Sequence, residues 1–449
     1  MRKTTHSRLI TNLFTVCFVA VSLSSCSSDS LASTANTSVP YSTFSTAVEN
    51  GQSSNRLSTC QTVRDIAPKQ VEYDSWDAPG VVTTDIEIDR KGNKIISGYL
   101  SNEQDFNYKD SFSTVGVDGW GFQFIAKFNP QSEFEWIRCL RESSLYHWYK
   151  GPVVDTDSNG FIYVCDSTLE RWTTTGELVW SSETLRWASE DSSDATRNCA
   201  TSSDGFTVVT GVDEIYFVSP EGENLWTKNL GWNSAATFLP NGNILMGSNS
   251  STAIINREGE LVWSNERPQR DDLGPDGLIG SDGGNSFATD QTGLVATDDG
   301  VIVATTINKK TDFDPSSRTF SLTPRWIQEI AIAKYSLKGN LQWATTIQPP
   351  STNPGDNDTQ YFEVFDSLQG KNGDVFVYGG GTHSRESQPM RMFVAKFSQS
   401  GKQLRFMWLE EYTSFIHNMG RHIDIDSRGR LYGTEEGLRV PPFIWSRDL

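Results

Sequence analysis

The sequence has few of the residues and motifs on which most enzyme active sites depend. It contains 6 cysteines and 5 histidines in 449 residues, and no two cysteines form Cys-x-x-Cys or Cys-x-x-Cys-His. Dithiol redox centres and covalent haem attachment therefore have no support in the sequence. It also lacks Gly-x-Ser-x-Gly, His-Glu-x-x-His and a phosphate-binding loop. No motif thus indicates an α/β hydrolase, a zinc protease or a nucleotide-binding enzyme.

Positive charge is scarce as well. The chain has 38 Lys and Arg against 56 Asp and Glu, so its formal net charge is −18. Affinity for nucleic acid depends on basic side chains that neutralise phosphates, and we therefore expect no nucleic-acid partner.

An apolar stretch lies near the start of the chain, at residues 9–23, after a few basic residues. It is too short and too polar for a membrane span and is typical of a signal peptide over residues 1–26. The stretch ends in Leu-Ser-Ser-Cys26, which resembles the lipoprotein box of bacteria. That resemblance implies a lipid on Cys26 and, with Ser27 next, delivery to the outer membrane, facing the periplasm or the cell exterior. The alternative is an ordinary secretory signal in which Cys26 has no role.

Residues 27–60 are rich in Ser, Thr, Asn and Ala. Such a segment cannot bury enough apolar surface to offset the entropy of ordering it, so we predict a flexible tether. Residues 61–449 are then the folded domain.

Residues 153–180 contain the unit that the rest of the domain repeats. It has four short runs of β-branched and aromatic residues, which we predict to be strands. One Gly-bearing turn joins the first run to the second, and another joins the third to the fourth. One such sheet cannot cover both of its faces and needs copies of itself on either side. The closing motif Gly-x-Leu-x-Trp, or a variant of it, recurs at residues 176–180, 222–226, 259–263 and 339–343, and in degraded form at 133–136 and 401–406. The opening turn recurs around Gly92, Gly160, Gly205, Gly242, Gly300, Gly373 and Gly429.

Seven opening turns, about 40 residues apart where there are no insertions, predict an all-β fold. The predicted architecture is a single β-propeller of seven four-stranded blades, with six or eight as the alternatives. The last unit has no closing strand, whereas residues 70–76 offer a strand that ends in Trp76. We therefore predict that this N-terminal strand completes the last blade and closes the ring, which removes exposed sheet edges.

Three segments resemble the bacterial SBBP and quinoprotein-like (PQQ-like) propeller repeats. They are residues 92–98 with 124–128 and Trp136, residues 311–315 with 332–343, and residues 393–397 with Gly401. The resemblance extends from about residue 73 onward and implies the propeller fold. Enzymes, scaffolds and binding proteins share that fold, so it does not select a function.

Four cysteines remain in the predicted domain and its flank: Cys60, Cys139, Cys165 and Cys199. An exported protein can oxidise them, and four cysteines allow three pairings that the sequence cannot distinguish. The alternative is that Cys139 and Cys165 are buried thiols.

A candidate calcium loop overlaps the first half of the repeating unit. Asp155, Asp157, Asn159 and Asp166 have the spacing of a calcium-binding loop with Asp in place of the closing Glu. The alternative is a plain hairpin turn, which favours the same residue types. We expect no other cofactor.

A candidate partner-binding face is formed by the longer connections, which should emerge on one side of the ring. Its candidate residues are Trp148, Trp187, Trp232, Trp326, His417 and His422. Loops on a rigid scaffold often carry binding sites. The alternative is that individual Trp residues fill the interfaces between blades.

The main hypothesis is a non-catalytic binding or scaffold protein of the bacterial cell envelope. The membrane would hold it through its N-terminal lipid, and its partner would be an envelope protein or a glycan. The alternative is an extracytoplasmic enzyme, either a polysaccharide lyase or hydrolase or a quinone-dependent dehydrogenase. Carboxylates are abundant, but no sequence pattern selects a catalytic pair.

Overall fold

The computed structural model describes a large part of the chain. The described residues are 61–63, 81–100, 104–105, 114–116, 122–142, 152–166, 168–182, 198–211, 214–229, 235–247, 251–266, 293–326, 328–349, 361–382, 391–411, 422–434 and 444–448. The chain divides into two units, Met1–Arg56 and Leu57–Leu449, and all described residues belong to the second. These residues form strands and turns, and they include no helix that could span a membrane.

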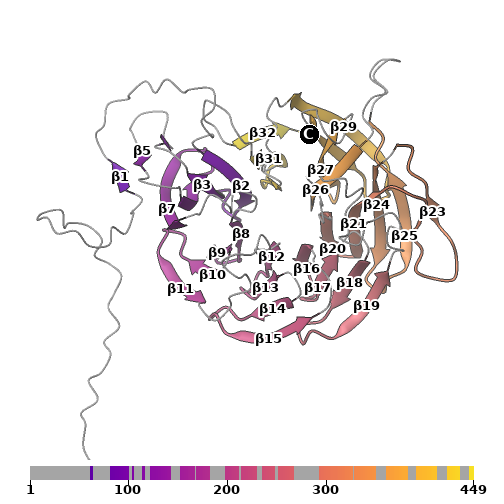
Figure 1. The fold of residues 1–449 in the computed structure, drawn as a ribbon, viewed down its shortest axis with the longest axis horizontal. Coiled ribbons are helices and arrows are strands. Elements are labelled where there is room, and N and C mark those ends of the chain that lie inside the picture. Colours follow the sequence, from indigo (N-terminus) through magenta and orange to yellow (C-terminus); the bar gives the residue numbers. More distant parts are fainter. Residues whose placement is uncertain are drawn as a thin grey trace, which may run out of the picture. The chain divides into compact units, whose positions relative to one another are not determined.

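Six antiparallel sheets of four strands make up most of the second unit (Figure 1). We number them as blades in chain order, and within each blade the strands run from the innermost to the outermost. Blade 1 contains β2 (Val81–Ile88), β3 (Lys94–Leu100), β6 (Phe122–Phe128) and β7 (Phe134–Glu142). Blade 2 contains β8 (Val153–Thr156), β9 (Ile162–Cys165), β10 (Leu169–Trp172) and β11 (Leu178–Ser182). Blade 3 contains β12 (Asn198–Thr201), β13 (Thr207–Thr210), β14 (Glu214–Val218) and β15 (Asn224–Asn229).

The other three four-stranded blades have the same order. Blade 4 contains β16 (Ala235–Phe238), β17 (Ile244–Gly247), β18 (Ser251–Ile255) and β19 (Leu261–Glu266). Blade 5 contains β20 (Gly293–Thr297), β21 (Gly300–Ile307), β24 (Glu329–Ser336) and β25 (Leu341–Thr346). Blade 6 contains β26 (Tyr361–Gln369), β27 (Val375–Thr382), β28 (Arg391–Phe397) and β29 (Gln403–Glu411).

A seventh sheet of three strands lies between blade 6 and blade 1. It contains β30 (Ile423–Ile425), β31 (Arg430–Thr434) and β32 (Ile444–Asp448). The Ile423 amide donates to Asp366 on β26, and the Ile88 amide on β2 donates to Asp424 on β30. The predicted single all-β propeller is therefore confirmed, with four strands in six blades and three described strands in the seventh sheet.

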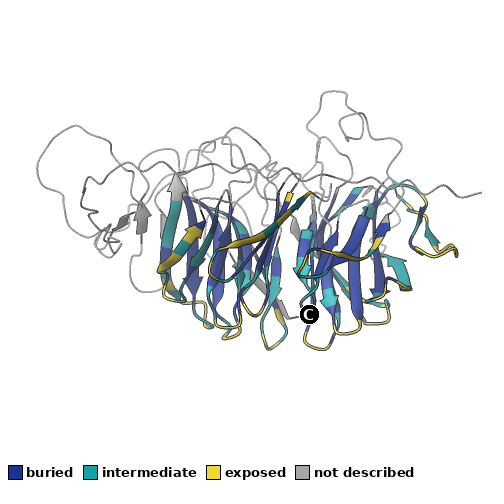
Figure 2. Cartoon of the chain, turned by 90° about the horizontal axis from the view of Figure 1, so that it is seen from below, coloured by how far each residue is buried: buried dark blue, intermediate teal, exposed yellow. Residues whose placement is uncertain are grey.

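The apolar core of the ring is divided among the interfaces between neighbouring sheets. Seven clusters of buried residues each combine side chains from two adjacent sheets. Between blades 5 and 6, for example, Ile302 and Ile332 pack with Phe362 and Phe393. Each sheet thus shelters a face of the next, which is why a single sheet of this sequence could not fold alone. In Figure 2 the buried strands lie inside, while exposed turns line the lower edge.

Tryptophans of the fourth strands join neighbouring blades at the periphery. Each Trp ring lies against the Gly of the closing turn in the next blade, in the pairs Trp136 with Gly176, Trp180 with Gly222, Trp263 with Gly339 and Trp343 with Gly401. The indole N–H groups of Trp136, Trp180 and Trp343 donate to a carbonyl two residues before that Gly, as Trp180 does to Pro220 at 2.9 Å. Trp226 makes the same hydrogen bond to Arg257 at 2.6 Å. The buried indole N–H of Trp263 has no hydrogen-bond partner among the described residues. The predicted burial of the closing-motif Trp against the next sheet is confirmed.

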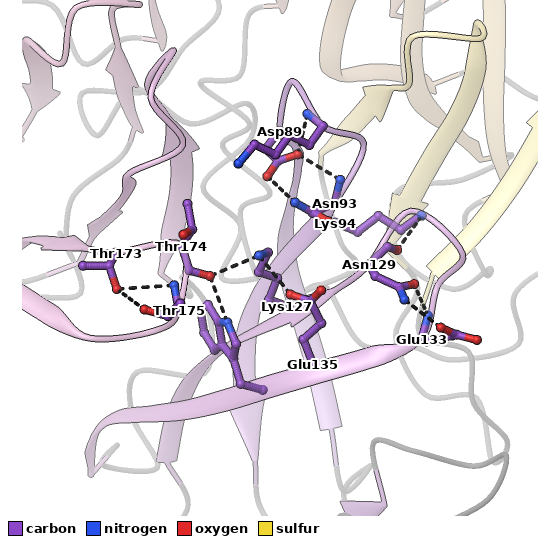
Figure 3. Close-up of polar contacts among 12 residues, drawn as sticks. Asp89, Asn93, Lys94, Lys127, Asn129, Glu133, Glu135, Thr173, Thr174 and Thr175 are labelled. Atoms are coloured by element: carbon purple, nitrogen blue, oxygen red, sulfur yellow. Dashed lines mark hydrogen bonds and ion pairs between the residues drawn. The ribbon is translucent and has the colours of Figure 1, made fainter.

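Figure 3 shows this contact between blades 1 and 2. The Thr174 carbonyl accepts hydrogen bonds from the Trp136 indole at 3.2 Å and from Lys127 Nζ at 3.1 Å. Lys127 also forms an ion pair with Glu135 at 2.9 Å. One carbonyl of the turn therefore holds both an aromatic and a charged side chain of the preceding blade.

A disulfide also joins two neighbouring blades. Cys165 on β9 is bonded to Cys199 on β12, with a Cα–Cα distance of 6.3 Å, and Cys139 is disulfide-bonded as well. Of the three pairings that the sequence left open, only one includes Cys165 with Cys199. The alternative of buried free thiols at Cys139 and Cys165 is wrong.

The N-terminal closing strand predicted at residues 70–76 lies outside the described residues. Two described features favour it. Blade 6 has Arg405 where the other fourth strands carry the docking Trp. In the part of the seventh sheet that the structure describes, there is no turn from a third to a fourth strand on which a Trp could dock. Blade 1 does have such a turn, with Ser132 at a φ of 65° in the usual place of Gly. A strand at 70–76 beside β32 in an experimental structure would confirm the prediction.

We predict that Gly222→Ala destabilises the protein more than Gly429→Ala. Both glycines have positive φ, at 88° and 86°, so each alanine costs roughly 1 to 2 kcal/mol of backbone strain. A Cβ on Gly222 would also meet the Trp180 ring at 3.0 Å, whereas one on Gly429 meets nothing within 4 Å. Overpacking of that kind costs a further ~1 to 3 kcal/mol. Thermal melting of the two variants measures the difference, and equal melting temperatures would contradict a structural role for the docked Trp.

Candidate functional site

Acidic side chains gather on the innermost strands around the axis of the ring. Asp85 and Glu87 lie on β2, Asp155 on β8, Asp366 on β26 and Asp424 on β30. Asp85 is 3% exposed, and the other four are half-buried. These strands are the edges of their sheets, since each pairs only with the second strand of its blade. The backbone N–H groups on their open side need acceptors from elsewhere.

Each of the four aspartates bridges two blades through the same pair of hydrogen bonds. One carboxylate oxygen accepts the N–H of the following residue, as Asp85 Oδ1 does from Ile86 at 2.8 Å. The other oxygen accepts an N–H from the first strand of the next sheet, as Asp85 Oδ2 does from Val154 at 2.7 Å. The remaining cross-blade pairs are Asp155 with the Thr201 amide, Asp366 with the Ile423 amide at 3.0 Å, and Asp424 with the Ile88 amide. We call this arrangement the carboxylate clasp.

The clasp is present at four of the seven interfaces and has a neutral counterpart at a fifth. Between blades 3 and 4 the Asn198 side-chain oxygen accepts the Ala236 amide at 3.4 Å. The first strands of blades 4 and 5, β16 and β20, contain no acidic residue. One side of the ring axis is therefore acidic, and the other is lined by small and apolar residues.

Burial and mutual repulsion disfavour the charged forms of Asp85, Glu87, Asp155 and Asp424. Burial raises the pKa of Asp85 to about 6, that of Asp155 to about 7 and that of Asp424 to about 8. Burial also raises the pKa of Glu87 well above its ordinary value, and the charges of Asp424 and Asp155 add to this effect. Hydrogen bonds from backbone amides oppose the shift in the aspartates without cancelling it.

His422 is the one basic group described beside these acids. Its Nδ1 lies 3.7 Å from Asp85 Oδ1 and 3.6 Å from Asp366 Oδ2. A protonated imidazole there would lower the pKa of Asp85, against the effect of burial. The sequence placed His422 on a partner-binding face, and the structure brings it to the carboxylate clasp.

Of the other residues predicted for the partner-binding face, the structure describes only Trp326. Trp326 packs against Phe362, with ring centroids 5.3 Å apart, and Arg325 lies 4.3 Å from its ring. It is thus part of the contact between blades 5 and 6, as the alternative interpretation had it. Trp148, Trp187, Trp232 and His417 lie outside the described residues.

The candidate calcium loop is folded as a strand, a tight turn and a second strand. Asp155 accepts the Thr156 and Thr201 amides, and Asp157 Oδ1 accepts the Asn159 and Phe161 amides at 2.9 Å each. Asp166 follows β9 on the far side of the turn. In the described part of the chain, no group of three or more His, Cys, Asp or Glu side chains is placed to hold a metal ion.

The sequence analysis missed most of the clasp, although a signal for it exists. Glu87, Asp155 and Asp424 each stand two residues before the first residue of an opening turn, at Asp89, Asp157 and Asp426. Asp85 stands four residues before its turn, and Asp366 four before the turn at Gly370. Aligning the repeats on their turns would have revealed the two recurring acidic positions.

The chain is distantly similar to several solved structures. Virginiamycin B lyase of Staphylococcus aureus is 12% identical, with a TM-score of 0.45, over 80% of this chain and 93% of the lyase. BamB of Moraxella catarrhalis is 14% identical, with a TM-score of 0.38, over 81% of this chain and 82% of BamB. A Bacteroides caccae protein of unknown function is 15% identical, with a TM-score of 0.34, over 64% of this chain and 90% of that protein.

The chain is a β-propeller. No family profile matches it, and a search of curated proteins found no relative. Likenesses this distant bear on the fold alone, so the function has to be argued from the residues of the propeller itself.

We predict that the propeller loses stability as the pH rises from 5.5 to 8.5. Asp85, Asp155 and Asp424 have higher pKa values in the folded protein than in the unfolded chain, so the folded state binds more protons between about pH 4 and 8. Their contribution to stability is therefore greatest at low pH and declines as the pH passes through about 6, 7 and 8. Melting temperatures across this range should fall by several degrees.

Asp424→Asn should flatten that decline, because the amide keeps an acceptor oxygen, as Asn198 does, and carries no charge. Asp299→Asn is the control. The Lys334 hydrogen bond lowers the pKa of Asp299, so its contribution is constant above pH 5 and the wild-type slope should remain. If the melting temperature of Asp424→Asn fell with pH as steeply as that of the wild type, the assignment of the pH dependence to the clasp would be contradicted.

Proposed function

We propose that the protein is a lipid-anchored lipoprotein of the bacterial envelope whose propeller is a non-catalytic binding scaffold for a protein or glycan partner. The observation that carries the proposal is that the acids near the axis bind backbone amides of the ring itself. In the described part of the ring, the clasp aspartates accept backbone amides of two blades with both oxygens. Acids held in this way stabilise a rigid body and are poorly placed for proton transfer to a substrate.

The placement of the connections supports a binding role. Neighbouring strands are antiparallel, so turns between first and second and between third and fourth strands leave at one end of the ring. The other connections leave at the opposite end. Those between consecutive sheets are residues 143–152, 183–197, 230–234, 267–292, 347–360 and 412–422. Long connections on one end of a rigid scaffold are the usual place for a binding surface.

The disulfide between blades 2 and 3 supports export. Disulfides form and persist mainly in oxidising compartments such as the bacterial periplasm. Together with the signal segment and Cys26, it favours an extracytoplasmic location. More than one acyl chain on Cys26 would give stable anchoring, since each buried methylene contributes about 0.8 kcal/mol.

One observation favours the enzyme alternative. Asp85 and Asp424 lie on innermost strands and have raised pKa values, and His422 lies beside Asp85. Acids with perturbed pKa values cluster at catalytic sites. A polysaccharide lyase or hydrolase would use such groups as general acid and base. The test is whether the purified protein cleaves envelope polysaccharides. Activity that is lost in Asp424→Asn but retained in Asp299→Asn would support the enzyme alternative.

We predict that a stoichiometric partner co-purifies with the full-length protein from detergent-solubilised envelopes. In a Cys26→Ser variant the protein should leave the membrane fraction, because the lipid that holds it is missing, while its propeller should melt as in the wild type. Quantitative mass spectrometry of the complex and of fractionated envelopes measures both effects. Recovery of a pure monomer from solubilised envelopes would contradict the binding role, and membrane retention of Cys26→Ser would contradict the lipid anchor.

A further inference from the structure

Exposed apolar side chains are concentrated on three neighbouring blades. Seven large hydrophobic residues are exposed in the described part of the chain, and five of them lie on the fourth strands of blades 2, 3 and 4. These five, which we call the outer belt, are Leu178, Val179, Leu225, Leu261 and Val262, each 46 to 60% exposed. Scattered exposed apolar residues need no explanation, but their concentration in one sector of a surface does.

The strands of the outer belt are neighbours in space. Figure 1 shows β11, β15 and β19 following one another along the outer circumference of the ring. Trp180 on β11 contacts Gly222, which precedes β15. Trp226 on β15 donates to the Arg257 carbonyl, which precedes β19. The strands that carry the five belt residues therefore follow one another on the circumference and contact each other's closing turns.

Three belt residues, Val179, Leu225 and Val262, occupy a β-bulge position at which the fold accepts either apolar or polar residues. In every four-stranded blade a β-bulge next to the closing turn leaves one fourth-strand residue without a partner on the third strand. The six bulge residues, in blade order, are Glu135, Val179, Leu225, Val262, Gln342 and Leu404. Bulges re-aim side chains and are often placed at functional edges.

The flanking blades show that polar residues suit this bulge. In blade 1 Glu135 forms an ion pair with Lys127 at 2.9 Å (Figure 3), and in blade 5 Gln342 is exposed. Packing thus does not require the Val, Leu and Val of blades 2 to 4. Their side chains are between 46% and 49% exposed to water, which is unfavourable unless another surface covers them.

Among the six four-stranded blades, the residue after the positive-φ residue of the closing turn is acidic only in blades 1 to 4, and blade 1 has no exposed apolar residue beside it. In blades 2 to 4 the residue after the closing-turn Gly is Glu177, Glu223 or Glu260, and all three are exposed. The same position holds Asn340 in blade 5 and Lys402 in blade 6. The outer belt therefore presents an aliphatic strip with a row of carboxylates along one border.

We propose that the outer belt is a second interaction surface, which binds a segment of another protein in which aliphatic side chains alternate with Lys or Arg. Aliphatic contacts cover the bulge residues, and the basic side chains of the segment pair with the glutamates at the border. Charge complementarity of this kind steers association and fixes the register of the bound segment. The belt lies on the outer circumference beside the closing turns, so it is separate from the strand ends that the connections between consecutive sheets join.

The test uses the purified full-length propeller protein and a fluorescein-labelled peptide of alternating leucine and lysine. We expect saturable binding in fluorescence anisotropy that weakens as the salt concentration rises. The triple variant Val179→Gln, Leu225→Gln and Val262→Gln should bind about tenfold more weakly or worse, a change of about 1.4 kcal/mol. Gln at the bulge is native to blade 5, so this variant should melt as the wild type does.

Two controls define the site. Leu404→Gln changes the corresponding bulge residue of blade 6, outside the belt, and should leave the affinity unchanged. A peptide with glutamate in place of lysine should not bind, and the triple variant Glu177→Gln, Glu223→Gln and Glu260→Gln should bind the lysine peptide more weakly and with less dependence on salt.

Equal affinity of the wild type and the bulge variant for the lysine peptide would overturn the proposal. So would a wild-type dimer in sedimentation velocity that the bulge variant loses, because the belt would then bind a second copy of this chain. Recovery of the same envelope partner with the bulge variant as with the wild type would leave the proposed function standing, since that partner would be bound elsewhere.

Discussion

The structure depends on how the inner edge of each sheet is satisfied. In a ring of sheets the first strand of every blade has an open side, and its N–H groups require acceptors that the blade itself does not supply. Here an aspartate of the preceding sheet provides the acceptor at four interfaces, including the one that closes the ring from Asp424 to the Ile88 amide. Because each aspartate accepts from two sheets, it fixes their relative position as well as satisfying the amide.

The periphery is joined by different means. Trp side chains of the fourth strands contact the closing turn of the next blade, and the indole N–H donates to that turn at Trp136, Trp180, Trp226 and Trp343. At these four positions the outer contact combines apolar area with one hydrogen bond. The Cys165–Cys199 disulfide adds a covalent link between blades 2 and 3. A body fastened near its axis and along its circumference is a suitable support for binding surfaces, whereas its buried acids are committed to structure.

Much of the architecture could be predicted from the sequence because it is encoded locally. Gly176 and Gly222 mark turns that need positive φ, and the Trp four residues later marks the docked strand. Aligning the repeats finds the acidic positions of the clasp, but not the amides that they bind, because those lie far away in the sequence: Asp85 and Val154 are 69 residues apart, and Asp424 and Ile88 are 336 apart. The local spacing around Asp155 fits a candidate calcium ligand as well as a plain hairpin turn, while its partner Thr201 lies 46 residues away. The outer belt was missed because its exposure follows from β-bulges, which depend on strand register.

Amide hydrogen exchange at the inner edges tests the central claim most directly. The amides of Ile88, Val154, Thr201 and Ile423 lie on edge strands, yet each donates to a carboxylate of the neighbouring sheet. The account predicts that they exchange as slowly as amides of the central strands β3 and β9. Exchange at the rate of exposed amides would contradict the claim that the aspartates hold the ring together.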